Sequence, residues 1–164
     1  MAIRLAREKA LAVAATLGAE RAPRWVLGAD TIVVLDGTVL GKPADAAHAR
    51  QMLTRLSGRE HRVVTGVAVV HSGTRRHWTT AVTSHVVMRA AGAEEIAAYV
   101  DTGEPLDKAG GYAVQGEGGR RFVTAVVGSE SNVIGLPVEE TLALLERAAR
   151  ELADAPPDPP GRGS

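Results

Sequence analysis

Two aspartate–lysine combinations in this sequence have the chemistry needed to hydrolyse a phosphate compound. Asp30 lies near the start of LGADTIVVLDGTVLGKP, a segment rich in Val and Ile, and Lys42 follows twelve positions later (42 − 30). Asp107 and Lys108 are adjacent within GEPLDKAG. A carboxylate activates water or holds a metal ion, and ammonium groups neutralise charge that develops on a phosphate. These residue types therefore predict hydrolysis of a phosphate ester or anhydride.

Asp30 is the most informative of these residues, because its neighbours are typical of a buried strand. A buried carboxylate is unfavourable unless a cation, a metal ion or backbone donors lie beside it. One interpretation is a structural aspartate that caps a turn or pairs with an arginine. The tight-turn dipeptide Asp36-Gly37 instead favours a hairpin that brings Asp30 and Lys42 to the same end of a sheet. We therefore expect these two residues to share a site.

Lysine is rare in this chain. Of 19 basic residues only Lys9, Lys42 and Lys108 are lysines, and the other sixteen (19 − 3) are arginines. Lysine carries a compact point charge that suits a confined place, whereas arginine serves as general surface charge. An alternative interpretation is that drift in composition alone left only three lysines in the chain. The glycines and prolines beside Lys42 and Lys108 favour the functional interpretation, because such loops often carry sites.

The composition restricts the class of protein. With 164 residues, 45% of them hydrophobic, the chain is long enough for one domain with a substantial core. The formal net charge of zero and 3% aromatic residues argue against nucleic acid or an anionic membrane as partners. Cysteine is absent, which excludes disulfides and thiolate metal sites. We expect a soluble, cytoplasmic protein without a membrane partner.

Hydrophobic periodicity predicts alternating helices and strands. In the first helix, residues 2–17, an apolar face is expected from Ile3, Ala6, Ala10, Val13 and Leu17. The other expected elements are a hairpin (25–35 and 38–41), a helix capped by Asp45 and ended by Gly58, strands at 61–71 and 76–89, a helix at 93–100, a strand at 121–127 and a helix at 138–152.

This order of elements predicts the α/β class, with an α+β arrangement as the alternative. The sheet is expected to be mixed and partly antiparallel, with helices beside it. We expect one domain over residues 1–153 and a disordered proline-rich tail over residues 154–164.

Five segments carry a resemblance to a known family. They occur in family order and with family-like spacing over nearly the whole chain before the tail. The segments are ADTIVV (29–34), LGKP (40–43), LSGREHRVVTG (56–66), TGEPLDKAGGYAVQG (102–116) and GSESNVIGLP (128–137). Together they resemble the Maf family of nucleotide pyrophosphatases.

The resemblance implies a function and a fold. Maf proteins hydrolyse nucleoside triphosphates to the monophosphate and pyrophosphate with a divalent metal, Mg²⁺ or Mn²⁺, and are linked to removal of non-canonical nucleotides and to cell-division arrest. The family fold is an α/β structure with an elongated sheet and a central cleft, similar to that of inosine-triphosphate pyrophosphatase. The forms ADT, DKAGGYAVQG and SNVIGLP resemble the branch acting on dTTP and UTP rather than the branch that prefers 7-methyl-GTP. A homodimer is a further expectation.

The family's functional residues can be carried over one by one. Asp30 matches the proton acceptor and is the expected metal ligand, and Lys42 matches the lysine of LGKP. Lys9 matches the lysine of the RLAREKA helix. Gln115, Asp107 and Lys108 match substrate-binding positions, with Gln115 able to contact a base edge or a phosphate oxygen.

The other candidates have simpler explanations. Thr65 is a further, weaker candidate for substrate binding. Ser131 and Asn132 are also weaker candidates, because polar side chains beside glycines often serve turns. The five histidines lack the close spacing of a zinc site, and we expect a structural role for His61.

One departure from the family pattern concerns the start of the chain. Maf proteins normally begin with a strand and a loop similar to LASxSPRR, followed by a glutamate, before the helix that here starts near Met1. That loop would supply donors for the triphosphate, and the glutamate would help to hold metal. A true truncation and a start codon assigned too far downstream both explain this. We expect the second, because every downstream motif is intact.

Two other functions remain open from the sequence. A non-catalytic nucleotide-binding or regulatory protein would bind nucleotide without hydrolysis that depends on Asp30. A purine-type pyrophosphatase of related fold would prefer ITP or XTP.

Overall fold

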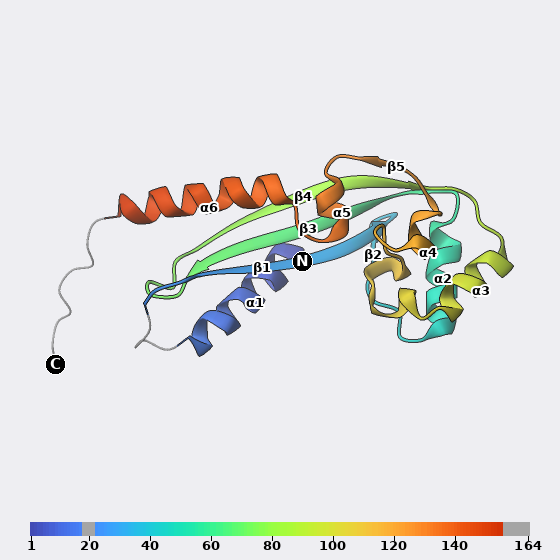
Figure 1. Cartoon of the computed structure of the whole chain (residues 1–164), viewed down its shortest axis with the longest axis horizontal. Helices are drawn as coiled ribbons and strands as arrows, with labels where there is room; N and C mark the ends of the chain where they lie inside the picture. The colour runs from blue at the N-terminus through green and yellow to red at the C-terminus, as the bar shows by residue number, and fades with distance from the viewer. Residues whose placement is uncertain (18–21, 156–164) are drawn as a thin grey trace.

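A five-stranded sheet forms the long axis of the protein (Figure 1). The computed structural model describes residues 1–17 and 22–155. The strand order across the sheet is β2-β1-β3-β4-β5. The strands are β1 (Trp25–Leu35), β2 (Thr38–Leu40), β3 (Glu60–His71), β4 (His77–Met88) and β5 (Val123–Val127).

Helices cover both faces of this sheet. The helices are α1 (Ala2–Thr16), α2 (Ala46–Leu56), α3 (Ala93–Asp101), α4 (Glu117–Arg120), α5 (Glu130–Ile134) and α6 (Val138–Ala153), with short 3₁₀ turns η1 (Glu104–Asp107) and η2 (Ala109–Gly111). Helix α1 packs on Ala68 and Val70 of β3, whereas α6 packs on Val67 and Val69. Alternate residues of a strand point to opposite faces, so α1 and α6 lie on opposite sides. Helices α2, α3 and α4 gather at one end of the sheet (Figure 1).

The predicted α/β class is confirmed, and the strands and long helices lie where periodicity predicts them. All four strand pairings within the described residues are antiparallel, so the prediction of a mixed sheet is wrong for this part of the chain. Of the predicted tail, residues 156–164 lie outside the described residues. No helix in the described part of the chain has the length and apolar character needed to cross a membrane.

The main core lies at the end of the sheet where α2, α3 and the 3₁₀ turns pack. Its fully buried side chains include Leu35, Leu56, Val86 and Tyr99. Asp45 caps α2 by accepting a hydrogen bond from the His48 amide at 2.8 Å, as predicted. This packed end is a rigid support for the loops that follow α3.

The buried face of α1 differs from the predicted one. Ala2, Ala6, Ala10 and Ala14 are buried, whereas Ile3 and Val13 are largely exposed. The reason lies in β1, where a Cβ added to Gly28 would overlap the Ala6 carbonyl oxygen. The helix backbone therefore rests almost directly on the strand, and only alanine fits between them. This close contact determines where α1 places its polar side chains.

Helix α5 is an element that periodicity did not predict. It has only five residues, and its Ser129 cap accepts a hydrogen bond from the Asn132 amide. Its stability comes from the fully buried Asn132 side chain, which donates to the Val63 carbonyl of β3 at 3.2 Å and to Ser84 Oγ of β4 at 2.9 Å. These contacts join segments that are distant in sequence, so a local pattern cannot reveal them.

Candidate functional site

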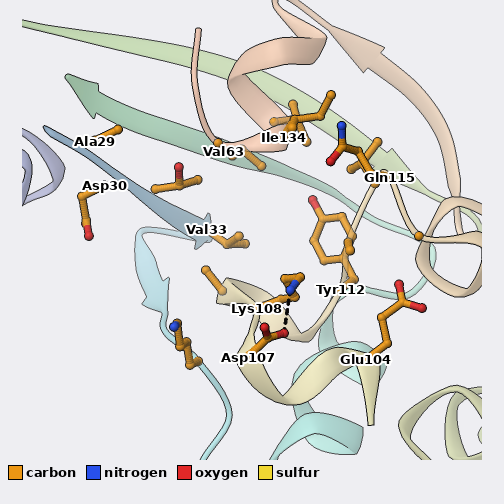
Figure 2. A pocket seen from close by; sticks show the side chains of 18 of the residues that line it. Ala29, Asp30, Val33, Val63, Glu104, Asp107, Lys108, Tyr112, Gln115 and Ile134 are labelled. Atoms are coloured by element: carbon orange, nitrogen blue, oxygen red, sulfur yellow. Dashed lines mark hydrogen bonds and ion pairs between the residues drawn. The ribbon is translucent and has the colours of Figure 1, made fainter. Parts of the chain in front are cut away.

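A cavity of about 510 Å³ lies between β1, the segment from η1 to α4, and α5 (Figure 2). The predicted site residues among those that line it are Lys9, Asp30, Lys42, Asp107, Lys108 and Gln115. The fold thus brings together residues that the sequence separates by more than one hundred positions (115 − 9 = 106). This is the cleft expected from the sequence.

Asp30 pairs with Lys9 rather than with Lys42. The Lys9 ammonium donates to Asp30 Oδ1 at 2.6 Å, and the Asp30 side chain is 14% exposed while that of Lys9 is 59% exposed. The sequence placed Asp30 and Lys42 in one site, and both line this cavity, but it did not select Lys9 as the ion-pair partner of Asp30. Helix α1 crosses β1 at Gly28, two residues before Asp30, and so brings Lys9 to the carboxylate.

Lys42 enters the same cavity from the loop that follows β2. This strand pairs with only the last three residues of β1, from Val33 to Leu35. The loop is then held by a hydrogen bond from the Gly110 amide to the Gly41 carbonyl at 3.0 Å. The bond connects LGKP to DKAGG, so the backbone itself keeps Lys42 near the second lysine-containing segment.

Asp107 and Lys108 form an ion pair in the cavity wall (Figure 2). Lys108 Nζ lies 2.6 Å from Asp107 Oδ1. The hydrogen bond from Lys108 lowers the pKa of the Asp107 carboxyl below its usual value, and the charges of Lys108 and Lys42 add to this effect. Asp107 is therefore ionised at neutral pH and tempers the positive charge on this side of the cavity.

The rest of the cavity lining combines polar and apolar side chains. Tyr112, Gln115 and Glu104 lie on one side in Figure 2, and Asp30 lies on the other. Val63 and Ile134 continue the apolar lining. Cations together with apolar side chains and a few polar groups suit a ligand with a phosphate part and an aromatic or sugar part.

Tyr112 is held by a buried histidine. His61 Nε2 and the Tyr112 hydroxyl lie 2.6 Å apart, and both side chains are buried. Burial lowers the pKa of His61 from 6.5 to about 4, although the charge of Glu60 acts in the opposite direction. Burial also raises the pKa of the Tyr112 hydroxyl. Both rings are therefore neutral at physiological pH, which agrees with the structural role predicted for His61.

The low pKa of His61 predicts acid sensitivity. Above pH 6.5 the ring is neutral in both the folded and the unfolded chain. As the pH falls from 6.5 to about 4, the unfolded chain takes up the proton first, so stability is lost across this window. The expected loss is about 3 kcal/mol. Urea unfolding at several pH values measures it. In His61→Gln this part of the pH dependence should disappear, and parallel profiles for both proteins would contradict the assignment.

Thr65 does not line the cavity, contrary to the prediction. It is fully buried, its hydroxyl donates to the Asn132 carbonyl at 3.1 Å, and it lies 2.8 Å from the Thr31 hydroxyl. Its neighbour Thr31 does line the cavity. Thr65 therefore stabilises α5 and Thr31 through these hydrogen bonds. No geometric observation favours the substrate-binding role predicted for it.

The described residues do not form a complete metal site. Within residues 1–17 and 22–155, no group of three or more His, Asp or Glu side chains could hold a metal ion. Mg²⁺ prefers octahedral coordination by oxygen atoms. Asp30 supplies a single carboxylate, and that carboxylate is paired with Lys9. Asp30 as a metal ligand stays a prediction.

Several cavity residues were missed by the sequence reasoning. They are Glu104, Tyr112 and Ile134. Glu104 had a signal, because it is a charged residue beside Pro105 in the same segment as Asp107. Ile134 had none, because its position depends on how α5 docks onto β3 and β4.

Comparison with known proteins identifies one family. The family described as "Maf-like protein" matches residues 1–148. A protein of Myxococcus xanthus (strain DK1622) named dTTP/UTP pyrophosphatase is 54% identical over 150 residues, which cover 91% of this chain and 72% of that protein. A protein of the same name from Anaeromyxobacter sp. (strain Fw109-5) is 50% identical over 164 residues, with 98% and 76% covered. Another from Escherichia coli O157:H7 is 51% identical over 154 residues, with 93% and 75% covered.

Proposed function

Because this chain belongs to the Maf-like protein family, we propose that it is a nucleoside triphosphate pyrophosphatase that forms a monophosphate and pyrophosphate. The observation that carries the proposal is the cavity itself. One side holds the Asp30–Lys9 pair, the other offers Tyr112, and Lys42 and Lys108 also line the cavity. A triphosphate fits the first side and a nucleoside fits the second.

In this reaction water attacks the α-phosphorus and pyrophosphate leaves. We assign Asp30 as the base that accepts the proton of the attacking water. Lys9 is a positioning residue at this stage, since its hydrogen bond to Oδ1 keeps the carboxylate oriented. Lys42 and Lys108 neutralise charge on the leaving pyrophosphate. The cavity contributes by holding the reactants in line.

The proposed substrates are dTTP, UTP and related modified pyrimidine nucleotides. The names of the relatives support this choice, since three proteins about half identical to this chain are called dTTP/UTP pyrophosphatases. Gln115 is the proposed contact for the nucleotide on the side of Tyr112, because an amide can donate and accept hydrogen bonds at once.

We also propose that hydrolysis needs Mg²⁺ or Mn²⁺. Mg²⁺ at phosphate-transfer sites is usually bound by one or two carboxylates together with the substrate phosphates. A cation that enters with the triphosphate therefore needs few protein ligands, and Asp30 is the proposed one. This agrees with the lack of a three-ligand cluster within residues 1–17 and 22–155.

Release of pyrophosphate from a nucleotide panel tests the function. Turnover of dTTP and UTP should exceed turnover of GTP, 7-methyl-GTP, ITP and XTP, and EDTA should abolish it. The assay is run on the 164-residue chain and on a version extended through the upstream in-frame codons. Preference for ITP or XTP would favour the purine-type enzyme. Nucleotide binding without hydrolysis in either version would favour the non-catalytic alternative.

A further inference from the structure

We propose that Glu104 determines specificity, by accepting a hydrogen bond from an N–H or O–H group on the nucleoside part of the substrate. This inference rests on the function proposed above, and it assigns a role to a residue that the sequence reasoning did not select. Glu104 is the first residue of η1 and lines the cavity. In Figure 2 it lies on the side of Tyr112 and Gln115, away from Asp30.

A buried tyrosine holds one oxygen of the Glu104 carboxylate. The Tyr99 hydroxyl donates to Glu104 Oε1 at 3.1 Å and itself accepts a hydrogen bond from the Ala113 amide at 3.3 Å. Tyr99 is fully buried, and burial raises the pKa of its hydroxyl. It is therefore a permanent donor, and the chain Ala113–Tyr99–Glu104 connects the carboxylate to the segment that carries Gln115.

The Glu104 carboxylate packs closely against the backbone at two glycines. A Cβ added to Gly116 would overlap Glu104 Oε1, and one added to Gly118 would lie 2.9 Å from Oε2. Any side chain at Gly116 would push the carboxylate away. Its position is thus defined from two sides, by the tyrosine and by the glycine backbone, before any substrate is bound. Such preorganisation is typical of groups that select a ligand.

The second oxygen of Glu104 is available for a ligand. Within residues 1–17 and 22–155, Oε2 accepts no hydrogen bond and no cation pairs with this carboxylate. The other two carboxylates of the cavity, Asp30 and Asp107, each have a lysine partner. Glu104 is therefore the cavity carboxylate that has no ion-pair partner among the described residues.

This charge restricts what Glu104 can contact. A triphosphate carries the same sign of charge and is repelled. Groups that donate a hydrogen bond are attracted, and a nucleoside offers the sugar hydroxyls and, in uracil and thymine, the ring N3–H. The position of Glu104 on the side of Tyr112 and Gln115 therefore also orients the nucleotide, with the nucleoside at this end and the phosphates at the end that holds Lys9 and Asp30.

Kinetics with matched substrates test the proposal. In Glu104→Ala the KM for UTP should rise about tenfold or more, with kcat within a factor of about two, because a hydrogen bond to a charged acceptor is lost from ground state and transition state alike. In Glu104→Gln the amide oxygen can still accept from Tyr99, and the NH₂ group replaces Oε2. The rise in KM should therefore persist although the fold is kept, as checked by circular dichroism and Tm.

Substrate analogues identify the donor. N3-methyl-UTP lacks the ring N–H, and 2′,3′-dideoxy-TTP lacks the sugar hydroxyls. For the analogue that lacks the contacted group, the wild type should already show the raised KM, and Glu104→Gln should raise it little further. An equal rise in KM for UTP and both analogues would show that Glu104 only supports Tyr99, and would overturn the proposal. An unchanged KM in both variants would also overturn it.

A nearby glutamate provides the control. Glu117 is exposed at the start of α4 and does not line the cavity, so Glu117→Gln makes the same change in charge without the contact. The KM of the Glu117→Gln variant for UTP should equal that of the wild type. If the wild type hydrolyses no nucleotide, the proposed function fails. If it hydrolyses UTP and the Glu104 variants match it, only the role of Glu104 fails.

Discussion

Asp30→Asn should lower kcat by about 10³-fold, the loss expected when a general base is removed. The asparagine amide has nearly the same shape, but it cannot accept the proton of the attacking water. Lys42 and Lys108 remain in the cavity, so nucleotide should still bind with a dissociation constant within a few-fold of that of the wild type. Pyrophosphate release measures the first quantity, and isothermal titration with UTP measures the second.

Asp101→Asn serves as the control for this prediction. Asp101 forms an ion pair with Arg50 at 2.8 Å, is exposed and does not line the cavity. Its variant should keep wild-type turnover. If Asp30→Asn keeps normal turnover, Asp30 is not the base. If it loses binding as well as turnover, the main role of Asp30 is in holding the substrate.

Gly28→Ala should destabilise the folded protein by about 3 kcal/mol, at the upper end of the costs of overpacking. The added methyl group would overlap the Ala6 carbonyl and lie 2.9 Å from Ala10 Cβ. Neither neighbour is a flexible side-chain end, so α1 must move away from β1. Because Lys9 is carried by α1, the Lys9–Asp30 pair should open and turnover should fall as well. Urea unfolding gives the change in the free energy of unfolding.

Gly41→Ala is the matched control for stability. A Cβ at Gly41 meets nothing within 4 Å, and the backbone there is not in the left-handed region. The same glycine-to-alanine change should therefore alter the free energy of unfolding by less than about 1 kcal/mol. Equal effects at both positions would mean that loss of glycine freedom, and not contact with α1, is what matters at Gly28.

The Gly28 contact also illustrates where local pattern fails. Periodicity correctly predicts that residues 2–17 form a helix and that Ala6 and Ala10 are buried, but it also places Ile3 and Val13 on the buried face. The structure buries Ala2 and Ala14 in their place. The choice depends on the distance between helix and sheet, which glycines on other elements decide.

Thr65 and Asn132 show the same limit. Both are polar residues near glycines, and both are weaker candidates for a ligand contact from the sequence. In the fold both side chains are fully buried, and the Thr65 hydroxyl donates a hydrogen bond to the backbone carbonyl of Asn132. The burial of these side chains depends on how α5 packs on the sheet. The residue types alone could therefore not show whether a polar side chain stabilises the fold or contacts a ligand.

By itself the sequence determined the residue types able to do the chemistry and the elements that carry them. Asp30, Lys42 and the Asp107–Lys108 couple could be selected because charged residues beside glycine and proline, or inside an apolar strand, conflict with their local surroundings, whereas Gln115 was selected by the family resemblance. Only the tertiary structure decided their partners. Lys9 reaches Asp30 because α1 lies against Gly28, and Glu104 faces the cavity because Tyr99 and Gly116 hold it there. Contacts of this kind join distant segments, and they arise only when the helices pack on the sheet.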